Sequence, residues 1–359
     1  MPNINNFLQY CVNMGASDLH ISSGCVPQMR VHGELRPLKF NKLSPKETLS
    51  LIGEILRPEQ QQYFSKHLDL DFCYEAANIG SFRANIFKQR NGIDAVFRII
   101  PTQIRSLEEL GLPRIVKDLT HYHHGLILVT GSAGNGKSTT LAAMIDYINS
   151  KRKLHIVTIE DPIEFVHPKK VANISQREVK LHTENFASAL RASLREDPDV
   201  ILIGELRDLE TISMAITAAE TGHLVFGTLH TRTAAKTVDR IIDVFPSNQQ
   251  NQIRTQLSEA LRGVISQQLI PRADGKGRAL AYEILVSTPA VANLIREAKT
   301  FQIPSLMQIG SKEGMCLMDH CLQRLLAEKV ITEEETMYRM ENKKGLTQKT
   351  STTGGSKNG

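Results

Sequence analysis

The sequence predicts an α/β protein built around a mostly parallel sheet that helices cover on both faces. From Gly125 onward, short apolar runs of strand length alternate with segments of helical periodicity, which is the pattern of a parallel sheet. The first hundred residues instead combine helical and extended segments, and only helical patterns remain after residue 285. We therefore expect a small α+β domain, an α/β domain and a helical C-terminal region.

The N-terminal domain is expected over residues 1–100. Apolar residues at helical spacing between Phe7 and Val12 indicate its first helix. The sequence Ser44-Pro45-Lys46-Glu47 has the form of a capping box with proline at the first helical position, and predicts the start of a second helix. Extended segments are expected near Asp69–Tyr74, Ser81–Gln89 and Asp94–Ile100.

Residues 101–115 are interpreted as a linker, and the α/β domain is expected over residues 116–342, with C-terminal helices over about 286–342. Helices are predicted to start after the N-caps Thr183 and Asp208. The tail, residues 343–359, is rich in Gly, Ser, Thr and Lys and is expected to be disordered. Continuous apolar runs indicate strands at Leu126–Val129, Leu154–Ile159, Val200–Ile203 and Leu224–Phe226.

Composition restricts the class of protein. The 359 residues are 41% hydrophobic and carry a formal net charge of only +5, which predicts a soluble globular protein of two or three domains. No apolar run approaches the roughly 18 residues of a membrane span, and the N-terminus lacks the features of a signal peptide. Five cysteines without a CxxC pair argue against a disulfide framework and a structural zinc site. We expect a cytoplasmic protein.

A complete phosphate-binding motif, G-x-x-x-x-G-K-[ST], begins at Gly131. It follows the expected strand Leu126–Thr130 and precedes a helical pattern, which is the context that the motif requires. Its glycines let backbone N–H groups face the phosphate oxygens, Lys137 neutralises the β and γ charge, and the Ser138 hydroxyl ligates Mg²⁺. The motif predicts ATP and Mg²⁺ as ligands. The residues expected to bind the nucleotide are Gly131, Ser132, Ala133, Gly134, Asn135, Gly136, Lys137, Ser138 and Thr139.

Two groups of acidic residues follow predicted strands. A phosphoryl-transfer enzyme needs a carboxylate near the Mg²⁺ and a group that orients the attacking water. Ligands bind at the carboxyl ends of strands in open α/β sheets. Glu205 follows one apolar strand, whereas Glu160, Asp161 and Glu164 follow another. The residues alone do not decide which of these three acts, and a solvated strand end is the alternative for each group.

Two histidines flank a third strand, His223 before it and His230 after it. A histidine at the end of a core strand beside this sheet can contact the γ-phosphate, but a lone histidine is usually structural. On the residues alone, both interpretations remain open.

Together these segments resemble the secretion ATPase superfamily and, within it, the type IV pilus retraction ATPases (the PilT/PilU family). The resemblance covers about residues 5–340, with its motifs in the family's order. GASDLHI is similar to the opening of the family's N-terminal domain, TIEDPIEF to its Asp box, LREDPDVILIGELRD to its Walker B region and TGHLVFGTLHT to its His box. The stretch Ala290–Glu297 resembles AIRNLIRE, the element that marks retraction ATPases.

The resemblance implies a PAS-like N-terminal domain joined to a RecA-like P-loop ATPase domain. It implies a homo-hexameric ring that hydrolyses ATP between neighbouring subunits and so powers pilus retraction and twitching motility. The implied partners are the inner-membrane pilus platform protein and a paralogous retraction ATPase. The implied location is cytoplasmic, peripheral at the inner-membrane base of the pilus machine.

By motif, the resemblance gives Lys137 and Ser138 the P-loop roles. It gives Glu205 the Walker B role, with Mg²⁺ bound through water, and makes Glu164 the catalytic glutamate of the Asp box. It also makes His230 a γ-phosphate contact.

The family further places arginines of the N-terminal domain in the active site, and Arg83 in SFRANIF and Arg98 in VFRII match those positions. A fixed, bidentate cation stabilises charge on a transferring phosphoryl group. The alternative is that both are strand-surface arginines paired with acids.

Two departures from the family pattern stand out. The P-loop reads GSAGNGKST where the family commonly has GPTGSGKST, and Ala292 replaces an arginine of the C-terminal element. The second departure leaves open an accessory paralogue or a regulatory subunit that hydrolyses ATP weakly. A pilus assembly or type II secretion ATPase is a nearer rival, but the tetracysteine insert typical of those proteins is absent. The mild charge, no tryptophan and only 5% aromatic residues argue against nucleic-acid binding.

Overall fold

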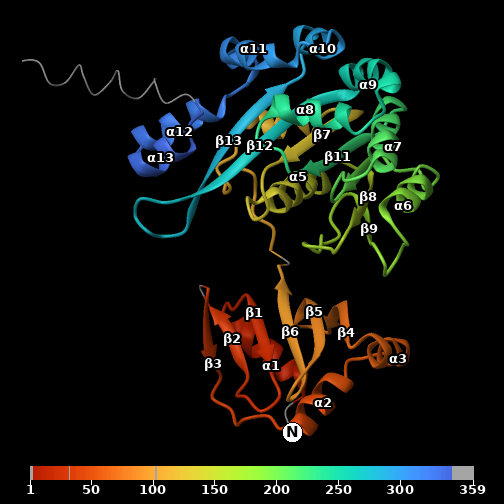
Figure 1. The fold of residues 1–359 in the computed structure, drawn as a ribbon, viewed down its shortest axis with the longest axis vertical. Coiled ribbons are helices and arrows are strands. Elements are labelled where there is room, and N and C mark those ends of the chain that lie inside the picture. Colours follow the sequence, from red (N-terminus) through yellow and green to blue (C-terminus); the bar gives the residue numbers. More distant parts are fainter. Residues whose placement is uncertain (1–2, 32, 102, 342–359) are drawn as a thin grey trace, which may run out of the picture. The chain divides into compact units, whose positions relative to one another are not determined.

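The computed structural model describes residues 3–31, 33–101 and 103–341, and it confirms the mixed α/β class. The described residues form two compact units (Figure 1). One contains the residues up to Gln103 together with Glu164–Pro168, and the other contains Ile104–Ile163 and the residues from Lys169 on. The division falls inside the 101–115 segment interpreted as a linker. The expected tail, 343–359, lies outside the described residues.

The first unit contains, in its described part, a six-stranded antiparallel sheet in the order β3-β2-β1-β6-β5-β4. Side chains of the first helix and of the sheet form a core of their own, which includes Phe7, Phe82 and Phe97. The expected capping box is confirmed, because the Glu47 amide donates to Ser44 Oγ at 3.3 Å and the Ser44 amide donates to the Glu47 carboxylate at 2.7 Å. The elements are α1 (Ile4–Asn13), β1 (Asp18–Ile21), β2 (Gln28–Val31), β3 (Glu34–Pro37), α2 (Pro45–Gly53), α3 (Pro58–His67), β4 (Asp69–Ala76), β5 (Gly80–Gln89) and β6 (Gly92–Ile100).

The second unit has, among the residues described, a seven-stranded sheet in the order β13-β12-β7-β11-β10-β8-β9. Neighbouring strands are parallel except β12 and β13, which form an antiparallel pair. Its strands are β7 (Gly125–Thr130), β8 (His155–Glu160), β9 (Asn173–Glu178), β10 (Val200–Ile203), β11 (Leu224–Leu229), β12 (Leu261–Pro271) and β13 (Arg278–Val286). Every residue of β7, β10 and β11 is buried, and because successive side chains point to opposite faces, both faces of the sheet are covered.

The helices of the second unit include the covering helices of the sheet and the C-terminal helical region (Figure 1). They are α4 (Arg114–Leu119), α5 (Lys137–Lys151), α6 (Phe186–Ser193), α7 (Leu209–Glu220), α8 (Ala234–Asp243), α9 (Ser247–Ala260), α10 (Pro289–Arg296), η1 (Thr300–Gln302), α11 (Ile303–Ile309), η2 (Gly310–Glu313), α12 (Met318–Ala327) and α13 (Glu333–Arg339). No helix in the described part of the chain is both long enough and apolar enough to span a bilayer.

Of the two N-caps predicted in the second unit, one is wrong. Asp208 caps α7 as expected, since its side chain accepts from the Thr211 amide at 2.8 Å. The cap of α6 is Asn185 and not Thr183, because the Asn185 side chain accepts from the Ser188 amide at 2.8 Å. Thr183 lies two residues upstream, where its hydroxyl contacts that of Ser188.

Candidate nucleotide-binding site

The loop between β7 and α5 has a backbone that only glycines adopt readily. Gly131, Gly134 and Gly136 have φ angles of +141°, +77° and +80°. A Cβ atom on Gly131 would lie 2.4 Å from the carbonyl oxygen of Gln267 in β12, so the loop and this strand approach closely. Gly136 is the N-cap of α5 and has no side chain to occupy the helix N-terminus. The loop therefore presents backbone N–H groups and the positive end of a helix dipole to an anion.

Lys137 starts α5 and its ammonium lies against the loop. Its Nζ donates to the carbonyl oxygens of Gly131 at 2.9 Å and Ser132 at 3.2 Å. Ser138 and Thr139 follow in the first turn of the same helix. The cation and the two hydroxyl residues thus come from the segment that the sequence assigned to the phosphates.

The neighbouring strand β12 holds this loop through contacts that the sequence did not predict. The buried Gln267 side chain donates from Nε2 to the carbonyl oxygen of Asn135 at 2.7 Å, and the Leu269 amide donates to Asn135 Oδ1 at 3.1 Å. Arg278 of β13 donates to the carbonyl oxygen of Gly134 at 3.3 Å. Asn135, which stands where the family has serine, therefore ties the loop to β12 through its side chain as well as its backbone.

Glu205 and His230 lie together at the carboxyl edge of the parallel sheet. Glu205 follows β10 and His230 follows β11, the strand between β10 and β7. His230 Nε2 is 3.2 Å from Glu205 Oε1, and Arg207 Nη2 is 2.7 Å from Glu205 Oε2. Partial burial acts to raise the pKa of Glu205, but the ion pair with Arg207 and the contact with His230 outweigh it and hold the pKa below its ordinary value. Glu205 is therefore ionised at neutral pH, as a ligand of Mg²⁺ or its water needs to be.

The sequence did not predict the role of Arg207, although Arg207 stands only two residues after Glu205.

His223 precedes β11, whereas His230 follows it, so the two histidines lie at opposite edges of the sheet. The Nδ1 of His223 is 3.0 Å from the carbonyl oxygen of Ala218, which accounts for it structurally. Of the two histidines, the structure thus places only His230 at the edge of the sheet that contains Glu205.

The acidic segment after β8 is divided between the two units. Glu160 ends β8 and accepts from the Thr158 hydroxyl at 2.7 Å and the Gln176 amide at 3.3 Å. Asp161 is exposed and follows in the second unit. Glu164 is exposed and belongs to the short segment grouped with the first unit. Its role as the catalytic glutamate stays a prediction.

Arg83 and Arg98 lie opposite each other on the adjacent strands β5 and β6 of the first unit. Arg98 Nε is 2.9 Å from the Oδ1 of Asp18, a buried carboxylate on β1, and Arg83 Nε is 3.9 Å from Asp71 Oδ1. These ion pairs offset the repulsion between two like charges placed directly across a sheet. The structure brings the two arginines together, pairs each with an acid and leaves the Arg98 side chain 68% exposed. Their catalytic roles stay predictions.

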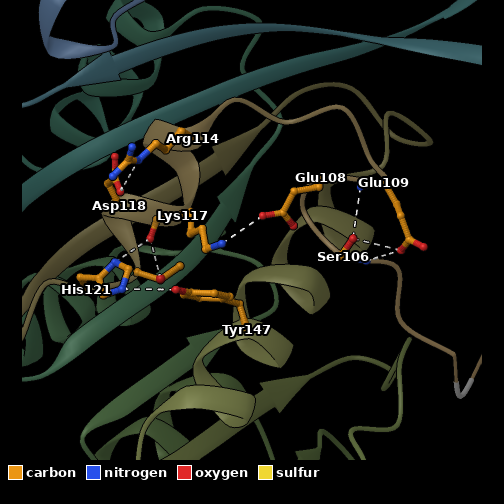
Figure 2. Close-up of polar contacts among 9 residues, drawn as sticks. Ser106, Glu108, Glu109, Arg114, Lys117, Asp118, His121 and Tyr147 are labelled. Atoms are coloured by element: carbon orange, nitrogen blue, oxygen red, sulfur yellow. Dashed lines mark hydrogen bonds and ion pairs between the residues drawn. The ribbon is translucent and has the colours of Figure 1, made fainter.

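A polar network supports α5 at the end distant from the P-loop (Figure 2). The Tyr147 hydroxyl of α5 is 3.4 Å from His121 Nε2, and Lys117 Nζ of α4 lies 4.8 Å from the centroid of the Tyr147 ring. Lys117 also forms an ion pair with Glu108 at 3.1 Å. Directly after α5, its C-cap residue Arg152 donates to the carbonyl oxygen of Thr120 at 3.0 Å. The segment that precedes β7 is therefore bound to the P-loop helix.

The model of the family described as type II/IV secretion system protein matches residues 1–358. The chain belongs to this family. Among curated members, it is 50% identical over 331 residues to the type IV pilus retractation ATPase PilT of Pseudomonas aeruginosa, covering 92% of this chain and 96% of the relative. It is 50% identical over 322 residues to a twitching motility protein of Neisseria gonorrhoeae, covering 90% and 86%.

A solved structure matches along nearly the whole chain. It is the crystal structure of the pilus retraction motor PilT with bound ADP, and it superposes with a TM-score of 0.91 at 46% sequence identity. The match covers 97% of this chain and all of that one. The chain is therefore similar in sequence and in fold to the pilus retraction motor PilT.

Proposed function

We propose that this protein is an ATP-hydrolysing motor that powers type IV pilus retraction. The similarity to a pilus retraction ATPase over nine-tenths of both chains carries the proposal. The P-loop beside Glu205 and His230 at one edge of the sheet supplies the chemistry. The P-loop follows β7, His230 follows β11 and Glu205 follows β10, and these three strands are neighbours in the sheet. Groups that bind the phosphates and the cation therefore lie at one edge of the sheet, as phosphoryl transfer requires.

The donor atoms of the site fit Mg·ATP. Mg²⁺ is usually bound by one or two protein oxygens together with substrate phosphates, and the Ser138 hydroxyl and ionised Glu205 are such oxygens. When bound, the ion offsets charge on the phosphates. Lys137 would neutralise phosphate charge from the helix start, Ser138 would bind the ion directly, and Glu205 would hold it through water. We assign Glu164 to orienting the attacking water.

Further parts of the proposal concern assembly and placement. We assign His230 to the γ-phosphate, and Arg83 and Arg98 to the stabilisation of developing charge. The motor works as a homo-hexamer in the cytoplasm and acts on the inner-membrane pilus platform protein. The domain boundaries drawn from the sequence stay predictions within this scheme.

An accessory paralogue is a second candidate, and one residue favours it. Ala292 is half-buried on α10 and replaces the arginine of the element that marks retraction ATPases. An Ala292→Arg variant that raises retraction in cells while leaving ATP turnover unchanged would favour this candidate over a principal motor.

The test is steady-state Mg·ATP hydrolysis by the purified protein, measured with its oligomeric mass, beside a Glu164→Gln variant. We expect the wild type to form hexamers and turn over ATP, and the variant to bind ATP with near-normal affinity but not to hydrolyse it. Equal turnover by both proteins would refute the role of Glu164. Nucleotide binding without turnover by the wild type would refute an independent motor.

A further inference from the structure

Glu283 is a buried carboxylate in β13 that none of the proposed roles uses. It is 6% exposed. Burial raises its pKa, and hydrogen bonds from two backbone amides act in the opposite direction. A buried acid costs stability unless it is bonded, so two well-defined partners indicate a specific role.

The two partners of Glu283 are the first residues of two different helices. Its Oε1 accepts from the Ala234 amide, at the start of α8, at 2.7 Å. Its Oε2 accepts from the Met318 amide, at the start of α12, at 3.4 Å. The N-cap of α12, Leu317, provides no side-chain acceptor, so Glu283 takes that place. One carboxyl group therefore caps two helices and lies at the positive ends of both dipoles.

Glu283 also lies in a row of buried polar side chains that reaches the P-loop strand. Ser266 of β12 pairs in register with Glu283 on one side and with Thr130 of β7 on the other. The Ser266 and Thr130 hydroxyls are 2.8 Å apart, which places them on the same face. Thr130 immediately precedes the P-loop, and a cavity of about 600 Å³ is lined by both Glu283 and P-loop residues. Glu283 is thus adjacent to the nucleotide loop across the sheet.

Helix α8, one of the two helices that Glu283 caps, begins shortly after His230 in the sequence. Only Thr231, Arg232 and Thr233 separate His230 from Ala234. The hydroxyls of Thr231 and Thr237 are 2.7 Å apart, which folds this short connection onto the first turn of α8. A shift of the α8 N-terminus therefore moves the connection that positions the His230 ring.

The C-terminal helical region contacts α8 at a second point. The Thr300 hydroxyl in η1 donates to Asp239 Oδ1 of α8 at 2.7 Å. Both α8 and α12 pack against β13, the strand that contains Glu283, and α8 also packs against β12. Figure 1 shows these helices beside the two strands. The region that contains the Ala290–Glu297 element is in this way connected to the helix that follows His230.

We propose that Glu283 is a positioning residue that ties α12 of the C-terminal helical region to the N-terminus of α8 and thereby sets His230 at the nucleotide site. This inference rests on the proposed ATPase function and adds how the C-terminal region influences turnover. In this proposal Glu283 acts through His230 and not by contacting the substrate.

The test compares full-length wild type with Glu283→Gln, which keeps one acceptor oxygen but cannot serve both amides. We expect kcat for ATP to fall about three- to tenfold while KM stays within about twofold, because a positioning contact is lost and the phosphate loop is kept. In a His230→Ala background, the same substitution is expected to leave kcat within about 1.5-fold, since residues that act as a unit are not additive. Unchanged kcat in the single variant, or effects that multiply in the double variant, would overturn the proposal.

The matched control is Thr332→Ala, which removes the hydroxyl that caps α13 by accepting from the Glu335 amide at 3.2 Å. This cap does not touch α8, so the variant is expected to lower the melting temperature without changing kcat. If Thr332→Ala lowers kcat as much as Glu283→Gln does, Glu283 acts through stability alone and the proposal is wrong.

Amide hydrogen exchange makes the test independent of turnover. In Glu283→Gln, peptides covering 230–238 and 316–322 are both expected to exchange at least about threefold faster than in the wild type. Acceleration of 316–322 alone, or of neither peptide, would overturn the proposal. If the wild type hydrolyses no ATP, the proposed function fails and this exchange result still decides the inference.

Discussion

Replacing Gly131 by alanine tests whether the close approach of the P-loop to β12 is required for nucleotide binding. The added Cβ would lie 2.4 Å from the Gln267 carbonyl oxygen, where real Cβ atoms stay beyond 3.0 Å. The obstacle is the backbone of β12, a strand paired on both sides, so the loop must move. The positive φ costs about 1–3 kcal/mol in a non-glycine residue. Loss of one charge-assisted phosphate hydrogen bond adds about 1.5–3 kcal/mol. Together these predict ATP binding weakened by about a hundredfold or more, at 1.4 kcal/mol per tenfold.

Gly134→Ala is the matched control in the same loop. Gly134 also has positive φ, but a Cβ there meets nothing within 4 Å. We expect only the left-handed backbone penalty of about 1–2 kcal/mol, which is about a 5- to 30-fold loss of affinity.

The assay is the dissociation constant of a fluorescent ATP analogue, with hexamer mass and melting temperature measured on the same samples. The reasoning is refuted if Gly131→Ala binds the analogue as tightly as Gly134→Ala does while both proteins remain folded.

Three further predictions concern single contacts. Asn135→Ala removes the side-chain acceptor for a β12 amide and is expected to weaken ATP binding about two- to tenfold in the same assay; unchanged affinity would show that this bond does not hold the loop. Arg207→Ala removes a cation that lowers the pKa of Glu205, so the acid limb of the kcat/KM–pH profile should move to higher pH; a limb that stays in place would contradict this role. For Asp18, partial burial raises the pKa, but hydrogen bonds and the charge of Arg98 outweigh it and lower the folded-state pKa below 3.8. Its pairing therefore stabilises the fold above the unfolded-state pKa and is lost as pH falls through the folded-state pKa; Asp18→Asn should flatten this acid dependence in melting experiments, and an equally steep loss would count against it.

The nucleotide loop was predictable because its chemistry is local. A glycine pattern, an apolar strand before it and a helical period after it all lie within one stretch of sequence, and the structure places β7, the loop and α5 accordingly. Glu205 and His230 were likewise found as polar residues that end apolar strands. Their contact could be anticipated from the parallel sheet, in which strand ends meet at one edge.

The missed residues depend on pairing between distant segments. Gln267 and Glu283 lie in β12 and β13, strands that the apolar runs did not indicate, because polar residues interrupt them. Their importance comes from β12 lying beside β7, more than a hundred residues away in sequence. The cap of α6 was misplaced by two residues because Thr183 and Asn185 both have suitable side chains, and only backbone geometry distinguishes them.

The most direct test of the central claim is the shortening of fluorescently labelled pili in cells that lack this protein and are complemented with wild type or Lys137→Ala. Lys137 contacts the P-loop carbonyls and is assigned to the phosphates, so its loss should abolish ATP use without disrupting the proposed hexamer. The account predicts that wild type restores pilus shortening and that Lys137→Ala, present at equal abundance and as a hexamer, does not. Restoration of shortening by Lys137→Ala would contradict the claim that ATP turnover at this site drives retraction.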